Sequence, residues 1–158
     1  MLTTLILWMA IALPVAVAME WWARLMHDRA WHGFLWVLHR SHHRPSGPIE
    51  LNDVFPVLHA PLAAGLMIQR AWFEGALLSE VLFGVGLGAT LFGVAYTIVH
   101  DGYIHGRLPV SFLGRFAYMR SLRDAHGLHH KHGREPYGLF LGEREVLAAR
   151  RRGVLPPG

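Results

Sequence analysis

The sequence has no cysteine and few charged residues. Asp, Glu, Lys and Arg make up 16% of its 158 residues, whereas 53% of the chain is hydrophobic. The absence of cysteine excludes disulfides, thiolate zinc sites and Cys-ligated iron–sulfur clusters, and it leaves imidazole and carboxylate as candidate metal ligands. The sequence also has no Gly-x-Gly-x-x-Gly turn and no P-loop, the usual fingerprints of dinucleotide and nucleotide binding.

Apolar residues fall in three blocks whose lengths approach the roughly 20 residues that a transmembrane helix needs. The first and third blocks show no amphipathic period, which disfavours the alternative of buried helices in a soluble bundle. No Lys or Arg precedes the first block, which disfavours a cleaved signal peptide. We therefore predict an all-α integral membrane protein with a single domain and about three to four transmembrane helices. The domain covers residues 1–158, and the predicted spans are residues 2–22, 54–73 and 76–99.

Basic residues are distributed unevenly between the connections of these blocks. Of the fifteen Lys and Arg residues, only Arg70 lies between the second and third blocks. The positive-inside rule therefore places residues 24–50 and 100–158 together in the cytoplasm. Two spans separate the His-rich segments 24–50 and 100–141, so both segments return to the same face and can form one cytoplasmic site at the helix ends.

Ten of the twelve histidines belong to a repeated pattern. Each half of the chain reads His-Asp-x-x-x-His-Gly followed by His-x-x-His-His, and chance placement of polar residues does not account for two such copies. Ten imidazoles exceed what one ion can bind, so the pattern predicts two metal ions. Imidazole suits Fe, Zn, Cu and Ni alike, and the pattern does not choose among them. The predicted ligands are His27, His32, His39, His42, His43, His100, His105, His126, His129 and His130.

The spacing of these histidines has a geometric consequence. The three members of His-x-x-His-His share one face of a helix. In the His-x₄-His pairs, by contrast, five helical steps separate the two rings by roughly 140°. Such a pair can share an ion only if the helix ends or bends between its members; otherwise each member serves a different ion. Gly33 and Gly106 directly follow these pairs and can end a helix there.

Several other residues are candidates for supporting roles. Metal-bound histidine usually gives its second N–H to a carboxylate or carbonyl, for which Asp28, Asp53 and Asp101 are candidates; the alternative is that they are cap or loop residues. We expect His59 to be a hydrogen-bonded interior residue and His132 to be a surface residue. The glycines of the third span permit close helix packing, or alternatively leave room for a ligand, and we favour packing. They are Gly84, Gly86, Gly88 and Gly93.

The histidine pattern resembles that of the fatty acid hydroxylase and sterol desaturase superfamily of membrane di-iron enzymes. Within it, the His27–Gly33, His39–His43 and Glu50–Asp53 segments are similar to those of bacterial and plant β-carotene 3-hydroxylases, as are His100–Arg107 and His126–His130. The resemblance extends from the first span to about Leu141. The chain departs from the family's pattern after His130, where the segment leading to Gly138–Leu141 is short.

The resemblance implies a non-haem di-iron monooxygenase of the bacterial cytoplasmic membrane. Its reaction would be O₂-dependent hydroxylation of carotenoid β-ionone rings at C3, from β-carotene through β-cryptoxanthin to zeaxanthin. Iron is expected in the active protein, because zinc has no redox chemistry and would mark a substituted form. The electrons would come from a ferredoxin or an NAD(P)H-dependent reductase. The expected partners are the carotenoid, that electron donor and membrane lipids, with no nucleic acid.

Three other functions are compatible with parts of the sequence. A fatty-acyl or sterol hydroxylase or desaturase would keep the chemistry and change the substrate. A non-catalytic membrane metal-binding or transport protein would place ligands inside its spans, whereas nine of the ten predicted ligands lie beyond the predicted spans. A bis-His haem protein would leave the paired histidines at 42–43 and 129–130 without a role.

Overall fold

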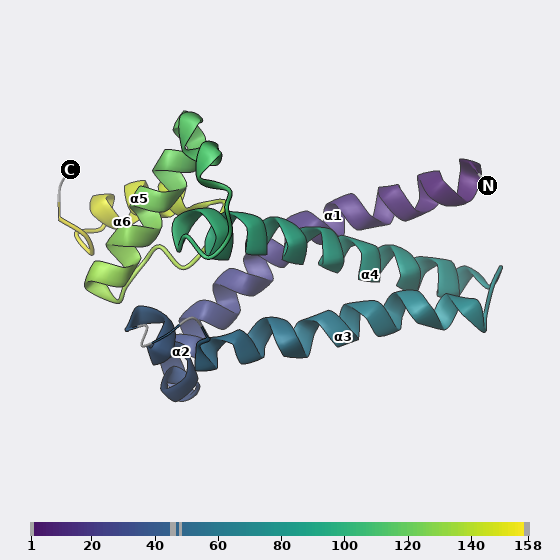
Figure 1. The fold of residues 1–158 in the computed structure, drawn as a ribbon. Helices are drawn as coiled ribbons and strands as arrows, with labels where there is room; N and C mark the ends of the chain where they lie inside the picture. Colours follow the sequence, from purple (N-terminus) through teal and green to yellow (C-terminus); the bar gives the residue numbers. More distant parts are fainter. Residues whose placement is uncertain (1, 45–46, 48, 157–158) are drawn as a thin grey trace. The chain divides into compact units, whose positions relative to one another are not determined.

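The computed structural model describes residues 2–44, 47 and 49–156, and every regular element in that part of the chain is a helix (Figure 1). The chain divides into two compact units. Met1–Met19 and Asn52–Ala95 form the first unit, and Glu20–Leu51 and Tyr96–Gly158 form the second. The predicted all-α class is confirmed.

Three helical stretches within the described residues are long and apolar enough to cross a membrane. They are Leu2–Phe34, Leu51–Ala71 and Leu77–Ile104. The three candidate stretches overlap the three predicted spans, and two of them run well beyond the predicted ends. At a rise of 1.5 Å per residue, the 33 residues of the first stretch extend about 50 Å, against about 30 Å for the hydrocarbon core of a bilayer. The helical turns beyond the predicted ends contain His27 and His32 in the first stretch and His100 in the third.

The first unit contains α3 (Val54–Ile68) and α4 (Leu77–Tyr96), which form a hairpin, and most of α1 (Leu2–Met26) (Figure 1). Glycines of α4 let both neighbouring helices approach closely. A Cβ atom added at Gly86 would lie 2.7 Å from Ala63 O in α3, and one added at Gly88 would lie 2.5 Å from Ala12 O in α1. Gly84 faces Ile11 in the same way, whereas a Cβ at Gly93 would meet nothing within 4 Å. Gly84, Gly86 and Gly88 therefore serve close helix packing, as predicted, whereas Gly93 does not.

A polar cluster ties the three helices of this unit together near the α3–α4 connection. The Glu80 carboxylate accepts hydrogen bonds from the Trp8 indole N–H at 2.7 Å and from Arg70 Nε at 2.9 Å. The Arg70 guanidinium also lies over the Trp8 ring, 4.9 Å from its centroid. Glu80, the only acidic residue of α4, and Arg70 therefore form an ion pair that neutralises both charges at the end of this apolar helix.

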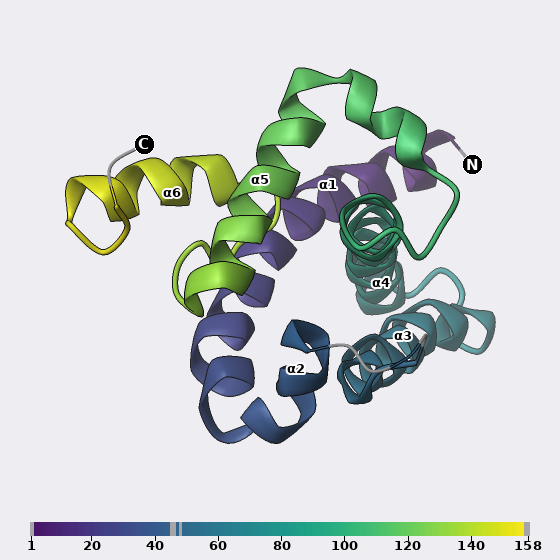
Figure 2. The ribbon, with the colours of Figure 1, turned by 60° about the vertical axis from the view of Figure 1, so that its left-hand side comes forward.

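The second unit is built from short helices and turns (Figure 2). Leu122, which is 1% exposed, packs with Val99 and Leu139 in one apolar cluster, and Ala125 packs with Val146 and neighbouring residues in a second. Both clusters are small, so apolar burial alone gives this unit only a modest core. Its elements are η1 (His27–Phe34), α2 (Trp36–His43), η4 (Thr97–Ile104), η5 (Ser111–Arg115), α5 (Ala117–His132) and α6 (Gly142–Arg151).

The contrast between Gly88 and Gly93 gives a test of the helix packing. Gly88→Ala forces a methyl group against the α1 backbone, and overpacking of this kind costs about 1–3 kcal/mol. We expect it to lower the midpoint of thermal unfolding in detergent. Gly93→Ala, on an open face of the same helix, serves as the control and should leave the midpoint unchanged or raise it. Equal midpoints for the two variants would contradict the close approach of α1 and α4.

Candidate metal centre

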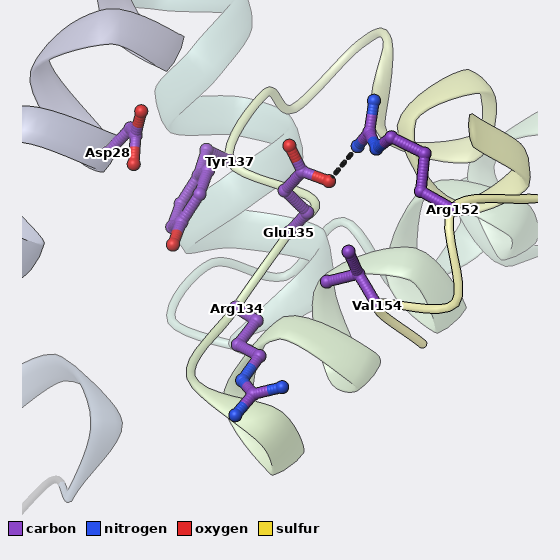
Figure 3. Close-up of a pocket in the computed structure, with 6 residues that line it drawn as sticks. All are labelled: Asp28, Arg134, Glu135, Tyr137, Arg152 and Val154. Carbon is purple, nitrogen blue, oxygen red and sulfur yellow. Dashed lines mark hydrogen bonds and ion pairs between the residues drawn. The ribbon is translucent and has the colours of Figure 1, made fainter. Parts of the chain in front are cut away.

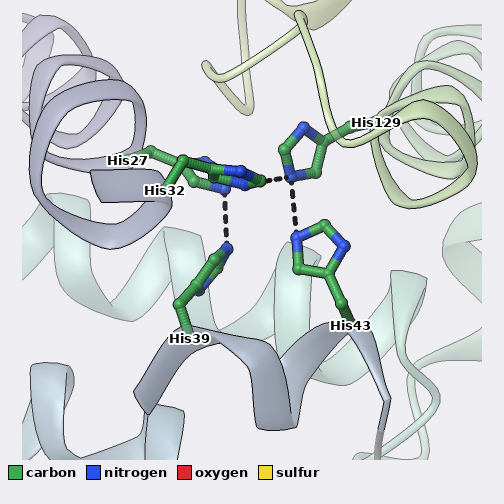
Figure 4. Close-up of side chains that lie close together, drawn as sticks. All are labelled: His27, His32, His39, His43 and His129. Atoms are coloured by element: carbon green, nitrogen blue, oxygen red, sulfur yellow. Dashed lines mark hydrogen bonds between the residues drawn. The ribbon is translucent and has the colours of Figure 1, made fainter. Parts of the chain in front are cut away.

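The histidines of both halves of the chain meet in the second unit, where nine of them form two groups. Within each group, one ring nitrogen of every residue lies within 4.8 Å of those of all the others. Cluster A, shown in Figure 4, has five members and cluster B has four. Cluster A consists of His27, His32, His39, His43 and His129, and cluster B consists of His42, His105, His126 and His130.

The separations of the ring nitrogens match those of ligands around a single ion. Nitrogens bound to one ion at about 2.0–2.1 Å lie about 3 to 3.4 Å apart in octahedral or tetrahedral geometry. In cluster A, His27 Nε2 lies 3.0 Å from His39 Nε2, and in cluster B, His126 Nε2 lies 2.9 Å from His130 Nε2. The two clusters therefore have the dimensions of two metal sites.

Two π-helical segments explain how histidines five residues apart in the sequence come close together. His27 and His32 both lie in η1, whereas His100 lies in η4 and His105 follows its last residue directly. A π-helix forms i→i+5 backbone hydrogen bonds, which place residues five apart above one another. The bond from His105 N to His100 O, at 3.0 Å, is one of these. Gly106, with φ of 70°, follows the end of η4 as predicted, whereas Gly33 has non-helical φ and ψ angles within η1.

The two His-x-x-His-His motifs divide their histidines between the clusters in opposite ways. Helix α2 contributes the first and third histidines of its motif to cluster A and the middle one to cluster B, whereas α5 does the reverse. The exchanged residues are thus His42 and His129. His42 Nε2 lies 3.1 Å from His130 Nε2, and His129 Nε2 lies 3.2 Å from His43 Nε2. Each helix therefore contributes to both clusters.

Hydrogen bonds to the outer nitrogens fix the tautomers of two rings in cluster A. His27 Nδ1 lies 2.8 Å from the Tyr137 carbonyl oxygen, and His129 Nδ1 lies 2.8 Å from that of Arg134. A carbonyl only accepts, so each neutral ring carries its proton on Nδ1 and a lone pair on Nε2. Both Nε2 lone pairs point into the buried cluster, where a cation between the rings would stabilise them. The donor set of cluster A therefore fits a metal ion.

Burial keeps the imidazoles neutral. Desolvation lowers the pKa of His105 and of His129 to about 2 and that of His130 to about 4. The pKa of His42 and of His126 is lowered well below its usual value, again mainly by burial and further by neighbouring imidazoles. Neutral imidazole is the form that binds metal, so these side chains are in the ligating state at neutral pH.

Carboxylates lie beside the outer nitrogens of two histidines near cluster B. His100 Nδ1 is 2.7 Å from Asp101 Oδ1, as the candidate role of Asp101 requires, and His42 Nδ1 is 3.1 Å from Glu50 Oε2. Sequence reasoning did not single out Glu50 for this role, although it opens the Glu-Leu-Asn-Asp segment. Asp28 pairs with Arg29 Nε at 3.2 Å. Asp53 belongs to the first unit, and its proposed role stays a prediction.

The remaining histidines differ in how near they lie to the clusters. His100 is outside the group of mutually close nitrogens, but its ring centroid lies 4.7 Å from that of His105 and 4.8 Å from that of His42. His59 donates from Nδ1 to the Phe55 carbonyl at 2.7 Å, and its side chain is exposed rather than interior. His132 is half-buried, and neither residue belongs to a cluster.

An open pocket of about 420 Å³ in the second unit has a mainly charged lining (Figure 3). Glu135 and Arg152 form an ion pair on its wall. A lining of this kind suits water and polar groups, and it does not suit a long apolar ligand. The lining residues are Asp28, Arg134, Glu135, Tyr137, Arg152 and Val154.

The sequence is similar to those of known β-carotene hydroxylases. Over 140 residues it is 47% identical to β-carotene 3-hydroxylase 1, chloroplastic, of Arabidopsis thaliana; the match covers 87% of this chain and 45% of that protein. It is 43% identical to the Haematococcus lacustris β-carotene 3-hydroxylase over 83% of this chain and 42% of that protein. The match to the Pseudescherichia vulneris β-carotene hydroxylase is 40% identical, over 75% of this chain and 66% of that protein.

The chain thus spans less than half the length of the plant relatives it matches. No solved structure matches it. The sequence model of the fatty acid hydroxylase family matches residues 9–145, which is most of the chain and includes all ten histidines of the repeated pattern. The chain belongs to the fatty acid hydroxylase family.

Proposed function

We propose that this chain hydroxylates carotenoid β-ionone rings at C3, converting β-carotene to β-cryptoxanthin and then to zeaxanthin. The observation that carries the proposal is the pair of adjoining clusters of buried, neutral imidazoles in a chain 47% identical to a β-carotene 3-hydroxylase. The ten histidines of the repeated pattern are the proposed metal ligands, with His100 completing cluster B. Asp101 and Glu50 orient ligands of that cluster through their Nδ1 atoms.

The residues of the site have three tasks in this proposal. The inward-facing Nε2 atoms of the two clusters would hold two iron ions. The acceptors beside the Nδ1 atoms of His27, His42 and His129 keep the lone pairs of these rings directed inward, since a ring that flips would present an N–H to the metal. Burial of the clusters, in which His129 is fully buried and His39 is 2% exposed, excludes bulk water from the metals. A site protected in this way limits the loss of oxidising equivalents to solvent.

Iron is the proposed metal because the reaction needs a redox-active pair. Bound iron ions supply the capacity to activate O₂ toward an unactivated C–H bond, which zinc lacks. In the overall reaction, the substrate C–H, O₂, two electrons and two protons give the alcohol and water. The chain contains no nucleotide fingerprint, so the electrons come from outside, from a ferredoxin or an NAD(P)H-dependent reductase. Exposed Arg144 and Arg151 on α6 provide positive charge for an acidic donor.

The proposed location is the bacterial cytoplasmic membrane, with the histidine segments facing the cytoplasm. Three candidate spans support membrane insertion, and the concentration of Lys and Arg outside the 54–99 hairpin supports this orientation. A carotenoid is a long apolar molecule dissolved in the bilayer. The charged lining of the pocket in Figure 3 favours entry of the substrate from the bilayer rather than through that pocket.

A second candidate function keeps the metal centre and changes the substrate to a fatty acyl chain or a sterol. The match to the fatty acid hydroxylase family favours it, because the family description is not limited to carotenoids. The carotenoid proposal is preferred because the relatives with 40–47% identity carry carotenoid names. A product assay separates the two.

Removing the exchanged ligand of cluster A tests the metal assignment. His129 Nε2 is 3.1 Å from His32 Nε2 and 3.2 Å from His43 Nε2, so His129→Ala should lose the ion of cluster A and all measurable hydroxylation. His132→Ala, on the same helix, is the matched control and should keep both the bound metal and the hydroxylation activity. Iron per chain, measured by elemental analysis of the purified variants, checks the first effect. A fully metallated and active His129→Ala protein would refute the assignment.

Pigment analysis tests the reaction. When the chain is expressed in cells that accumulate β-carotene, we expect β-cryptoxanthin and zeaxanthin, and we expect neither with His129→Ala. Chromatographic separation of the extracted carotenoids provides the measurement. Unchanged β-carotene, with iron-loaded protein in the membrane and a competent electron donor present, would overturn the carotenoid proposal. The same cells should then be analysed for hydroxylated fatty acids and sterols.

A further inference from the structure

The segment between α5 and α6, residues 134–141, supplies backbone acceptors to two members of cluster A. As described above, the carbonyls of Arg134 and Tyr137 accept from the Nδ1 atoms of His129 and His27. His27 lies in η1 and His129 in α5, so one stretch of backbone orients rings from two separate elements. This is the short segment in which the chain departs from the pattern of the carotene hydroxylases.

Two carboxyl groups accept hydrogen bonds from backbone N–H groups of this segment. Glu145 accepts from Tyr137 N at 2.9 Å and from Gly138 N at 3.2 Å, while Arg24 Nε donates to the same carboxylate at 2.9 Å. Glu20, which is 5% exposed, accepts from Leu141 N at 3.0 Å. Charge-assisted bonds to backbone N–H groups are about twice as strong as neutral ones. The position of the Tyr137 carbonyl therefore depends on Glu145.

Gly138 makes this arrangement sterically feasible. A Cβ atom added there would lie 2.6 Å from Glu145 Oε1 and 2.8 Å from Glu20 Oε1. Any larger residue would displace one or both carboxylates from the backbone. The absence of a side chain at this position thus lets two negatively charged groups approach the same turn.

Cluster B and its neighbour His100 receive a different kind of support. There the carboxylates of Glu50 and Asp101 contact imidazole Nδ1 atoms of His42 and His100 directly. A carboxylate acceptor raises the basicity of an imidazole ligand more than a carbonyl does. In cluster A the carboxylate of Glu145 lies one peptide group further away, behind the Tyr137 backbone.

We propose that Glu145 is a positioning residue for cluster A: it holds the backbone at Tyr137 and Gly138 so that the Tyr137 carbonyl fixes the Nδ1–H tautomer of His27. The inference rests on the proposed function only in taking both clusters to bind metal. It makes the two metal positions inequivalent. Cluster A depends on Glu145 and the α5–α6 segment, whereas cluster B depends on Glu50.

The test compares Glu145→Gln with Glu143→Gln, an exposed residue in the same turn of α6. A glutamine at 145 offers one acceptor oxygen in place of two, and its amide N–H₂ would face a backbone donor. The measurement is a titration of metal-free protein in detergent with Co²⁺, followed by visible absorption. Loss of an outer hydrogen-bond partner typically weakens metal binding about 10- to 100-fold. We expect this loss at one site in Glu145→Gln and no change in Glu143→Gln.

A double-variant comparison identifies the site affected. In a His43→Ala background, which removes a ligand of cluster A, Glu145→Gln should not weaken the remaining Co²⁺ site further, whereas Glu50→Gln should. Equal weakening of both sites by Glu145→Gln, or of neither, would overturn the inference while leaving the di-metal proposal in place. Failure of the unaltered chain to bind Co²⁺ at all would overturn both.

Imidazole tautomers provide a readout that needs no metal. In ¹⁵N-labelled metal-free protein, long-range ¹H–¹⁵N correlation should show the Nδ1–H form for His27 and His129. Glu145→Gln should convert His27 to a mixture of tautomers and leave His42 and His129 unchanged, and Glu143→Gln should alter none of the three rings. Unaltered tautomers in folded Glu145→Gln protein would contradict the positioning role.

Discussion

The convergence of imidazole lone pairs in a buried space is the constraint on which this structure depends. Burying a polar nitrogen without a partner is costly, and of the nine imidazoles in the two clusters five are buried and four are half-buried. The free-energy cost of burial is offset if a hydrogen-bond acceptor at Nδ1 fixes the orientation of the ring and if Nε2 binds a cation. Backbone carbonyls orient the rings of His27 and His129, and the Glu50 carboxylate orients the ring of His42, in each case through Nδ1. Much of the second unit, whose apolar core is small, is therefore arranged around orienting these rings.

The helices meet this constraint through local departures from regular α-helix. The π-helical segments η1 and η4 bring histidines five residues apart into register. Helices α2 and α5 remain α-helical, and each directs two rings toward one cluster and one toward the other. The result is a pair of clusters joined by the exchanged residues His42 and His129, so that loss of either helix would disrupt both. The apolar helices of the first unit, packed through Gly86 and Gly88, follow the separate requirements of a bilayer.

The sequence is sufficient to predict three long apolar helices and the gathering of the repeated histidines, because both depend on composition and repetition. It was not sufficient to predict the ends of the helices, since regular backbone hydrogen bonding continues through polar residues after the apolar block ends. An ideal helix also separates residues five apart, so the π-helical segments were not anticipated beyond the expectation of a break or bend. The contact of His27 with the Tyr137 carbonyl joins positions 110 residues apart. Because every residue type has a carbonyl, no side-chain pattern could have indicated that partner.

The exchange of the middle histidines is the central structural claim, and an anomalous-scattering map of iron-loaded crystals tests it most directly. Data collected at the iron edge should show two peaks. One should lie within bonding distance of His129 together with His39 and His43, and the other within bonding distance of His42 together with His126 and His130. A single peak, or peaks that place His129 on the same ion as His126 and His130, would contradict this account.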